Sequence, residues 1–451
     1  MHELITPAQM YQMDTAAIAS GITLELLIDR AGRAVAEEIT RRFGARKTVV
    51  LCGPGNKGRD GAAAAECLKN WGWPITISNN IKGAELIIDA LYGAGLNREF
   101  PQTLADQINA AGVPVVSIDL PSGLDGVSGH PRGACVQAAL TITFMRKKLG
   151  HVLLPGRNLC GEVVVRDIGI PESIIADLGV STFENTKQNL PSASTSGHKF
   201  GRGHAVIVSG NALQTGASRL AASAALKIGA GLVTILGERE ALQVQATHLT
   251  SIMLRECTSP KDLKLVLDDK RINALCIGPA AGVGNATKQN VKVTLASGVA
   301  TVLDADALTS CANTPTQLFD WIQKNPIRAV VMAPHEGEFA RLFKDIAHSS
   351  VSKLEKARTA AKRSGATVIL KGADTVIAAP NGHAKINSNA PPSLATAGSG
   401  DVLAGLATGL LAQGMSGFDA ACAAVWLHGN AANRLGTRSF MAEDLLPHIV
   451  P

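Results

Sequence analysis

The sequence predicts two α/β domains, each built on a largely parallel sheet with helices on both faces. Three observations support this prediction. Short β-rich runs alternate with helix-length segments along the whole chain, as they do when parallel strands are connected through helices. The chain has 451 residues, more than the roughly 100–200 residues of one ordinary domain. One polar stretch, residues 184–197, interrupts the alternation.

The first domain is expected to span residues 1–183 and to contain a doubly wound sheet. Its candidate strands are residues 47–52, 74–78, 85–91, 113–119, 140–144 and 162–167. The segments "ELLIDRAGRAVAEEITRRF" and "GAAAAECLKNWG" are predicted to be helices. In the first of these helices, apolar residues at positions 27, 28, 31, 35 and 39 fall on one face.

The segment "ENTKQNLPSASTSG", residues 184–197, combines small and polar residues without hydrophobic periodicity, so we interpret it as a linker. The alternation of strand and helix patterns then resumes over residues 198–451, which form the second domain. We find no internal repeat, so the two domains are expected to have different folds of the same class.

Composition narrows the class of function. The net charge of +6 is modest, and Lys and Arg are spread along the chain, which favours a small anionic ligand over nucleic acid. The eight cysteines form no CxxC pair and are expected to be reduced thiols. No apolar run approaches the roughly 18 residues of a membrane span, and the first residues lack a signal-peptide pattern. We therefore expect a cytoplasmic enzyme without membrane contact.

The stretch "GPGNKGRDG", residues 53–61, follows a predicted strand and begins a predicted helix. Such a glycine loop can bind phosphate through backbone N–H groups at the helix N-terminus, or it can be a tight structural turn. Two further loops follow strands of the same sheet: "LIIDALYGAGLNREF" contains Asp89, and "VVSIDLPSGLDG" contains Asp119 and Ser122. Because open α/β sheets bind ligands at the carboxyl ends of their strands, these side chains are expected to cluster there with Asn56 and Asp60. Each Asp taken alone could instead be an N-cap or an Asx-turn residue.

These three loops, together with "KLGHVLLPGRNLCGEVVVRDIGIP", resemble the signature segments of the NAD(P)H-hydrate epimerase family across residues 1–172. The resemblance implies a Rossmann-like domain that interconverts the R and S forms of hydrated NADH and NADPH with the help of K⁺. It implies that Asp119 contacts the nicotinamide part and that Asp89 and Ser122 are K⁺ ligands. The other implied substrate contacts are Asn56, Lys57, Gly58, Arg59, Asp60, Gly93, Ala94, Gly95, Leu96, Asn97, Arg98 and Glu99.

The chain departs from the family at Lys57. The family usually has Asn-Asn-Gly-Gly-Asp where this chain has Asn-Lys-Gly-Arg-Asp, residues 56–60, and the second Asn of that pattern is a K⁺ ligand. A lysine has no acceptor to offer a cation. One hypothesis is that the Lys57 ammonium replaces K⁺ and pairs with Asp89, while Arg59 binds a substrate phosphate. The alternatives are that the domain has lost epimerase activity and only binds ligand, or that Lys57 is a solvated side chain.

In the second domain, "ATAGSGD" places three small residues directly before Asp401 and an apolar helix. Backbone N–H groups at Gly398 to Gly400 would stabilise a transferring phosphate, and the Asp401 carboxylate would accept a hydroxyl proton. This pattern is similar to the anion hole of ribokinase-like folds, although Asp401 could be only an N-cap. The turn in "ILKGADT" would hold a nucleotide through Lys371. His335, at a strand-to-helix junction, is either a ligand contact or a surface histidine.

Seven segments in the expected order resemble the ADP-dependent NAD(P)H-hydrate dehydratase family over residues 198–451. They are "HKFGRGHAVIVSG", "TGASRLAASAALKIGAGLV", "IGPAAG", "VLDADAL", "APHEGEFARL", "LKGADT" and "AGSGD". The resemblance implies ADP as phosphoryl donor, Mg²⁺, and Asp401 as catalytic base. It implies that Ala217, Gly282, His335 and Asp401 contact the hydrated nicotinamide cofactor. The implied nucleotide contacts are Lys371, Gly372, Ala373, Asp374, Thr375 and Gly400.

Two departures from this second family bear on substrate affinity. A usual Gly-Pro-Gly turn ends in Ala280, and Pro391 stands where Asn is usual, with Asn389 two residues earlier. The sequence as a whole predicts a fused repair enzyme that binds NADHX or NADPHX and an adenine nucleotide, and we expect a homo-oligomer. The choices between ADP and ATP and between NADHX and NADPHX stay open. The alternative function is a ribokinase-like vitamin or small-alcohol kinase with a noncatalytic N-terminal ligand-binding module.

Overall fold

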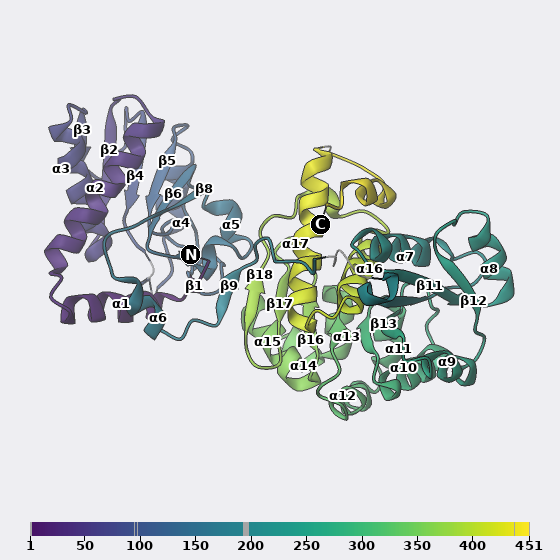
Figure 1. The fold of residues 1–451 in the computed structure, drawn as a ribbon. Coiled ribbons are helices and arrows are strands. Elements are labelled where there is room, and N and C mark those ends of the chain that lie inside the picture. The colour runs from purple at the N-terminus through teal and green to yellow at the C-terminus, as the bar shows by residue number, and fades with distance from the viewer. Residues whose placement is uncertain (1, 94, 97, 193–197, 437, 451) are drawn as a thin grey trace. The chain divides into compact units, whose positions relative to one another are not determined.

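The computed structural model describes residues 2–93, 95–96, 98–192, 198–436 and 438–450. The chain divides into two compact units, Met1–Glu184 and Asn185–Pro451. Each unit is an α/β domain, as the sequence predicts, and Figure 1 shows the helices and strands of both. Residues 185–192, expected to be linker, belong to the second unit, where Asn185 is buried and its amide donates to Asn387.

A six-stranded parallel sheet in the order β3-β2-β4-β5-β6-β8 forms the centre of the first unit. All six predicted strands are present. They are β2 (Thr48–Cys52), β3 (Ile75–Ile77), β4 (Leu86–Ala90), β5 (Val115–Ile118), β6 (Leu140–Phe144) and β8 (Glu162–Arg166). β1 (Leu4–Ile5) and β7 (Lys147–Lys148) form a separate two-stranded parallel sheet, and β9 (Thr182–Glu184) ends the unit.

Helices cover both faces of this sheet, because successive strand residues point to opposite sides. On one face, Val50 and Ile88 pack with apolar residues of α2 and α3, and on the other, Val49 and Ile87 pack with α4. The helices of the unit are α1 (Pro7–Ala19), α2 (Leu24–Arg42), α3 (Asn56–Asn70), α4 (Gln102–Asn109), α5 (Gly156–Leu159) and α6 (Glu172–Asp177). The predicted doubly wound sheet is thus confirmed.

The second unit contains a mixed sheet whose strands follow the order β12-β11-β10-β13-β14-β15-β16-β17-β18. The strands pair in parallel as far as β16, after which β17 and β18 are antiparallel. Their bounds are β10 (His204–Val208), β11 (Leu232–Gly237), β12 (Met253–Glu256), β13 (Ile272–Ile277), β14 (Ala300–Leu303), β15 (Val330–Met332), β16 (Thr367–Leu370), β17 (Val376–Ala378) and β18 (Ala384–Ile386).

A nearly apolar helix, α16 (Ser399–Ala412), lies in the core of the second unit. It packs closely against α7 (Gly216–Lys227) because Gly405 has no side chain. A Cβ at this position would stand 2.1 Å from the carbonyl oxygen of Ala221. This contact fixes the N-terminus of α16, where Asp401 lies. The remaining helices are α8 (Arg239–Ala246), α9 (Pro260–Leu267), α10 (Asn285–Ser297), α11 (Ala305–Cys311), α12 (Pro315–Gln323), α13 (Glu336–Leu342), α14 (Lys344–Ala347), α15 (Lys353–Ser364) and α17 (Gly417–Leu435).

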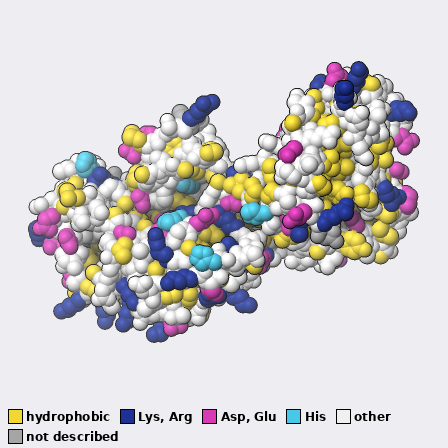
Figure 2. All heavy atoms as spheres, turned by 180° about the vertical axis from the view of Figure 1, so that it is seen from behind, with side chains coloured by type: hydrophobic (Ala, Val, Ile, Leu, Met, Phe, Trp, Pro, Cys, Tyr) yellow, Lys and Arg dark blue, Asp and Glu magenta, His cyan; other side chains and the backbone are white. Residues whose placement is uncertain are grey.

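The distribution of charged side chains on the surface agrees with their spread along the sequence. On the face shown in Figure 2, Lys and Arg side chains are dispersed among acidic and neutral ones. Within the described part of the chain, every helix is too short or too polar to cross a bilayer. All eight cysteines are free thiols.

Candidate functional sites

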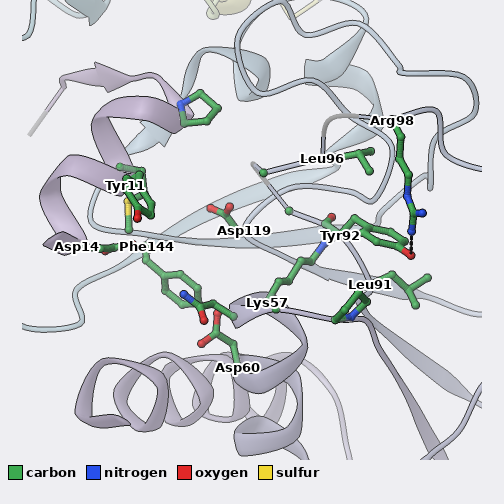
Figure 3. A pocket seen from close by; sticks show the side chains of 17 residues that line it. Tyr11, Asp14, Lys57, Asp60, Leu91, Tyr92, Leu96, Arg98, Asp119 and Phe144 are labelled. Carbon is green, nitrogen blue, oxygen red and sulfur yellow. Dashed lines mark hydrogen bonds between the residues drawn. The ribbon is translucent and has the colours of Figure 1, made fainter. Parts of the chain in front are cut away.

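A cavity of about 590 Å³ opens at the carboxyl ends of β2, β4, β5 and β6 in the first unit (Figure 3). This is the edge at which open α/β sheets bind ligands. The predicted site residues that line it are Asn56, Lys57, Asp60, Gly93, Gly95, Leu96, Arg98 and Asp119. The structure therefore brings the three predicted loops together around one space.

The glycines of the loop 53–61 allow close packing of backbone on backbone. A Cβ on Gly53 would stand 1.9 Å from the carbonyl oxygen of Leu91, and one on Gly58 would stand 1.8 Å from that of Gly53. A Cβ on Gly61 would stand 2.4 Å from the Cβ of Ala90. These glycines hold the start of α3 against β4, which directs the side chains of Asn56 to Asp60.

The side chain of Lys57 is buried and reaches from α3 to the loops that follow β4 and β5 (Figure 3). Its ammonium donates to the carbonyl oxygens of Tyr92 at 2.7 Å and Leu120 at 2.6 Å, and to the Oγ of Ser122 at 3.3 Å. The Oδ2 of Asp89 lies 3.6 Å from Nζ. Burial lowers the pKa of Lys57, and the carboxylate of Asp89 opposes that shift.

Asp119 is held in the left-handed backbone region, with a φ of 63°. The Nζ of Lys148, which is fully buried, lies 2.7 Å from Asp119 Oδ1, and the Oγ1 of Thr143 donates to the same oxygen. Burial alone would disfavour the charge, but the Lys148 ammonium lowers the pKa of Asp119 to about 2. The Nε2 of His151 forms a hydrogen bond of 2.7 Å with the backbone carbonyl oxygen of Asp119. The site therefore presents a fixed anion to its cavity.

Two further carboxyl groups, those of Asp60 and Asp14, line the cavity, and their pKa values are raised whereas that of Asp119 is lowered. Burial, reinforced by the charges of Asp119 and Asp14, raises the pKa of Asp60 well above its ordinary value. Burial also raises the pKa of Asp14 to about 6. Environments that separate the pKa values of neighbouring carboxyls are typical of acid–base sites. Asp60 can thus donate a proton beside an Asp119 carboxylate that stays charged, whereas Asp14 gains or loses its proton near pH 6.

Some residues expected at this site lie elsewhere. Gly58, Arg59 and Glu99 are not among the described residues that line the cavity. The exposed Arg59 pairs with Glu25 at 3.5 Å, because α3 carries position 59 to the side that faces α2. Ala94 and Asn97 lie outside the described residues.

Sequence reasoning missed the contribution of α1. This helix supplies Met10, Tyr11 and Asp14 to the cavity wall, and β6 supplies Phe144. A helix start was visible in the sequence, since Thr6 is followed by Pro7 and then by Gln9, which completes a capping box with Thr6. The spacing did not show that α1 returns to the sheet edge.

In the second unit, Asp401 lies in the first turn of α16, after Gly398 in the left-handed conformation. Burial and the nearby charge of Asp304 raise the pKa of Asp401 to about 6, although Lys371 opposes the shift. Asp401 forms no ion pair of 4 Å or less with any other described residue. It is therefore a half-buried carboxyl that can accept a proton near neutral pH.

Lys371 connects the predicted nucleotide turn to this helix start. Its Nζ donates to the Oδ1 of the buried Asp304 at 2.7 Å, and a Cβ on Gly400 would stand 3.7 Å from Nζ. Burial alone would lower the pKa of Lys371, but Asp304 raises it above its ordinary value. A permanent positive charge thus lies beside the N–H groups of the α16 N-terminus, where both favour a phosphate.

The turn of residues 371–375 is closed by its own side chains. Thr375 Oγ1 donates to the carbonyl oxygen of Gly372 at 2.7 Å and accepts from the Gly372 N–H. Asp374 is paired with Lys353 at 2.6 Å, so its carboxylate holds α15 to the turn. Ala373 lies between Gly372 and Asp374 in this closed turn.

The predicted cofactor contacts of the second unit belong to three separate segments of the chain. His335 is the N-cap of α13 and forms a reciprocal capping box with Glu338. Ala217 is in the first turn of α7, and Leu220 of that helix lies 2.8 Å from a Cβ position on Gly398, at the start of α16. Gly282 lines a separate cavity of about 200 Å³, and its N–H donates to Asp306, two residues from Asp304.

The two departures from the family pattern have visible consequences. Ala280 has a φ of 55°, a conformation that a glycine would adopt without strain. Asn389 is bound to α17, because its amide donates to the Trp426 carbonyl and its own carbonyl accepts from Asn433. A buried histidine on α17, His428, was not predicted, and its Nε2 has no partner among the described residues.

Comparison with known proteins identifies both halves. Residues 205–450 match the family described as NAD(P)H-hydrate dehydratase. Residues 24–80 and 74–150 match the family described as the YjeF-related protein N-terminus. The crystal structure of an ADP/ATP-dependent NAD(P)H-hydrate dehydratase from Bacillus subtilis, co-crystallised with ATP and Mg²⁺, superposes with a TM-score of 0.51 at 26% identity. That match covers 58% of this chain and 92% of the other.

Relatives described as bifunctional match nearly the whole of this chain. A bifunctional NAD(P)H-hydrate repair enzyme from Moorella thermoacetica is 35% identical over 98% of this chain and 95% of its own length. The corresponding enzyme from Escherichia coli is 32% identical over 95% of this chain and 90% of its own. A ribokinase-like superfamily protein from Enterococcus faecalis, 22% identical with a TM-score of 0.50, covers 58% of this chain and 89% of the other, and shares the fold of the second unit.

Proposed function

Because this chain belongs to the family of bifunctional NAD(P)H-hydrate repair enzymes, we propose that its two sites divide one repair reaction between them. The first unit is the NAD(P)HX epimerase, and the second unit is the ADP/ATP-dependent NAD(P)HX dehydratase. The observation that carries the assignment of residues is the position of Asp401. A half-buried carboxyl with a pKa of about 6 lies at a helix N-terminus beside Lys371.

In the dehydratase site, Asp401 accepts the proton of the C6 hydroxyl, whose oxygen attacks the terminal phosphorus of the nucleotide. The bond from that phosphorus to its bridging oxygen breaks, and Lys371 and the N–H groups at Gly400 stabilise the charge that develops. The C6–O bond then breaks as the lone pair of N1 stabilises C6, and phosphate leaves with the bonding electrons. A proton passes from C5 to solvent, which restores NADH or NADPH. With ADP as donor, the other product is AMP.

The expected Mg²⁺ fits the residues present. The carboxylate of Asp304 is a hard ligand of the kind that Mg²⁺ takes together with phosphate oxygens, and its charge acts on Asp401, which stays free to accept the proton. In that place the ion would neutralise phosphate charge. Lys371 to Thr375 would bind the nucleotide, while Ala217, Gly282 and His335 would contact the hydrated cofactor.

In the epimerase site, C6 is inverted when the hydroxyl leaves and water returns to the other face. Asp60, kept protonated by burial and by the charges of Asp119 and Asp14, donates a proton to the departing hydroxyl. The ring cation that forms is stabilised by the carboxylate of Asp119. Water then adds to C6 from the opposite face and loses a proton to solvent, and the carboxylate of Asp60 regains a proton from solvent.

The test is a reaction of the purified chain with mixed R and S hydrate, Mg²⁺ and ADP, followed by NADH absorbance. Complete recovery of NADH supports both activities, whereas a plateau near the S fraction, persisting beyond the time of spontaneous epimerisation, would show an inactive first unit. No recovery would refute the proposed function. Nucleotide consumption that depends on a vitamin alcohol would favour the kinase alternative. The cytoplasmic location and the homo-oligomer stay predictions.

A further inference from the structure

The Lys57 ammonium is surrounded by oxygen atoms in the way that a bound monovalent cation is. Two backbone carbonyls, those of Tyr92 and Leu120, and the hydroxyl of Ser122 accept its three N–H groups. The carbonyls can only accept, so the three contacts match the three donors of a charged ammonium. Backbone carbonyls are also the groups that replace the hydration shell of K⁺ in proteins.

The K⁺ ligands implied by resemblance, Asp89 and Ser122, already have hydrogen-bond partners within the protein. The carboxylate of Asp89 accepts from the Ser122 N–H at 2.8 Å and from the Ser117 hydroxyl at 2.9 Å. The Ser122 hydroxyl donates to Asp89 and accepts from the Tyr92 N–H at 2.9 Å. A second cation at these oxygens would stand next to the Lys57 ammonium and be repelled by it. The residues present do not fit a K⁺ ion.

We propose that Lys57 is a covalently tethered cation that takes the place of K⁺, so that the epimerase site of this chain works without a monovalent metal ion. This inference rests on the proposed epimerase function of the first unit. Lys57 is a positioning residue here, because it ties the start of α3 to the loops after β4 and β5. Those loops supply Tyr92 and Asp119 to the cavity.

The buried charge of Asp89 explains why some cation is required at this place. Its side chain is fully buried, and the positive charge nearest to it among the described ion pairs is Lys57. Removal of that charge would leave a buried carboxylate without a counter-ion, which is strongly unfavourable. A free cation small enough to enter would then bind. The site of a Lys57→Asn variant should therefore recruit K⁺, with the Asn carbonyl as an added ligand.

The first experiment measures the equilibration of R and S hydrate by the full-length protein in KCl and in choline chloride of equal ionic strength. The wild-type rates are expected to agree within about twofold, while Lys57→Asn is expected to lose on the order of a hundredfold in choline chloride. Added K⁺ or NH₄⁺ should restore the variant with a saturable dependence. Lys69→Asn, an exposed position in the last turn of the same helix, is the matched control and should resemble the wild type in both salts.

A second readout does not depend on activity. Crystals of wild type and of Lys57→Asn are soaked in RbCl, and anomalous scattering is measured at the position of the lysine nitrogen. Rubidium is expected only in the variant. If the Asn variant does not fold, Lys57→Met replaces it, because this substitution removes the charge but keeps the apolar stem. K⁺ should raise the unfolding temperature of Lys57→Met more than that of the wild type.

The outcomes separate this inference from the proposed function. A wild-type rate that requires K⁺, or rubidium bound beside an intact Lys57, would overturn the tethered cation. A Lys57→Asn variant equally active in choline chloride would overturn it as well. If the wild type shows no epimerisation in any salt while the dehydratase restores NADH from S hydrate, the proposed epimerase function itself has failed.

Discussion

The Nζ of Lys148 lies 2.7 Å from the Oδ1 of Asp119, inside the first unit and beneath its cavity. Lys148 is fully buried and also donates to the Oγ1 of Thr143, so the pair is fixed in one geometry. This arrangement keeps Asp119 charged although burial opposes the charge. The anion that lines the cavity is therefore maintained by a buried lysine that is not part of the cavity lining.

Replacement of this lysine should destabilise the first unit. Lys148→Met leaves the Asp119 carboxylate without its partner, and we expect a loss of about 3–5 kcal/mol of unfolding free energy at neutral pH. The wild-type Asp119 has a depressed pKa, so its stabilising contribution is present above the unfolded value of about 4 and is lost as the pH falls toward about 2. The difference between variant and wild type should shrink over that same range.

Calorimetry can measure this effect on the full chain, because ADP should stabilise only the unfolding transition of the second unit. Lys69→Met, on the exposed face of α3, is the control and should leave the transition of the first unit in place. An unchanged transition in Lys148→Met would contradict the role given to this ion pair.

The acid role of Asp60 predicts a specific pH dependence. Its pKa is raised, so the proton is present at neutral pH and is lost as the pH rises through the raised value. The epimerisation rate should therefore fall at high pH. Asp60→Asn should lower the rate by about 10²–10⁴-fold and abolish that fall. The measurement is the rate of R and S equilibration against pH, and an unaltered profile in the variant would exclude Asp60 as the acid.

The base role of Asp401 predicts that the rate of dehydration rises with pH, opposite to the dependence expected for epimerisation. With a pKa of about 6, its carboxylate is protonated below that pH and becomes able to accept a proton above it, so dehydration should increase through pH 6. Asp401→Asn should lower kcat of dehydration by about 10²–10⁴-fold. Epimerisation by the same variant is the internal control and should be unaffected, because Asp401 belongs to the other unit.

Nucleotide affinity should depend on Lys371. Lys371→Met removes the ammonium beside Gly400 and leaves the buried Asp304 without its partner. We expect ADP binding to weaken by about tenfold to a hundredfold, the range of one lost charged hydrogen bond. Isothermal titration calorimetry measures it. Lys362→Met, an exposed lysine in the last turn of α15, should bind ADP like the wild type.

The packing role of the glycine loop can be tested by a single methyl group. Gly58→Ala would place a Cβ 1.8 Å from the Gly53 carbonyl oxygen, so the loop must shift. We expect a loss of about 1–3 kcal/mol in the stability of the first unit, together with weaker epimerisation. Gly44→Ala, where a Cβ would meet nothing within 4 Å, is the matched control. Equal unfolding temperatures for the two variants would contradict this interpretation.

Local patterns were sufficient for the strands of the first unit. The candidate strand 140–144 is β6 (Leu140–Phe144) with the same bounds, while 113–119 is longer than β5 (Val115–Ile118). The end of β5 differs because Asp119 leaves the strand in the left-handed conformation, at the point where it turns its carboxylate to Lys148. That distortion depends on a residue 29 positions further along the chain.

The sequence by itself determined that the chain has two α/β domains, which loops leave their strands at the ligand edge, and which family each half resembles. These properties depend on periodicity and on short motifs, which are local. Only the tertiary structure decided that Lys57 points inward to the carbonyls of Tyr92 and Leu120 while Arg59 points outward to Glu25. It alone brought Asp14 of α1 to the cavity. The physical reason is that side-chain direction and buried charge depend on partners distant in sequence, and no local pattern specifies them.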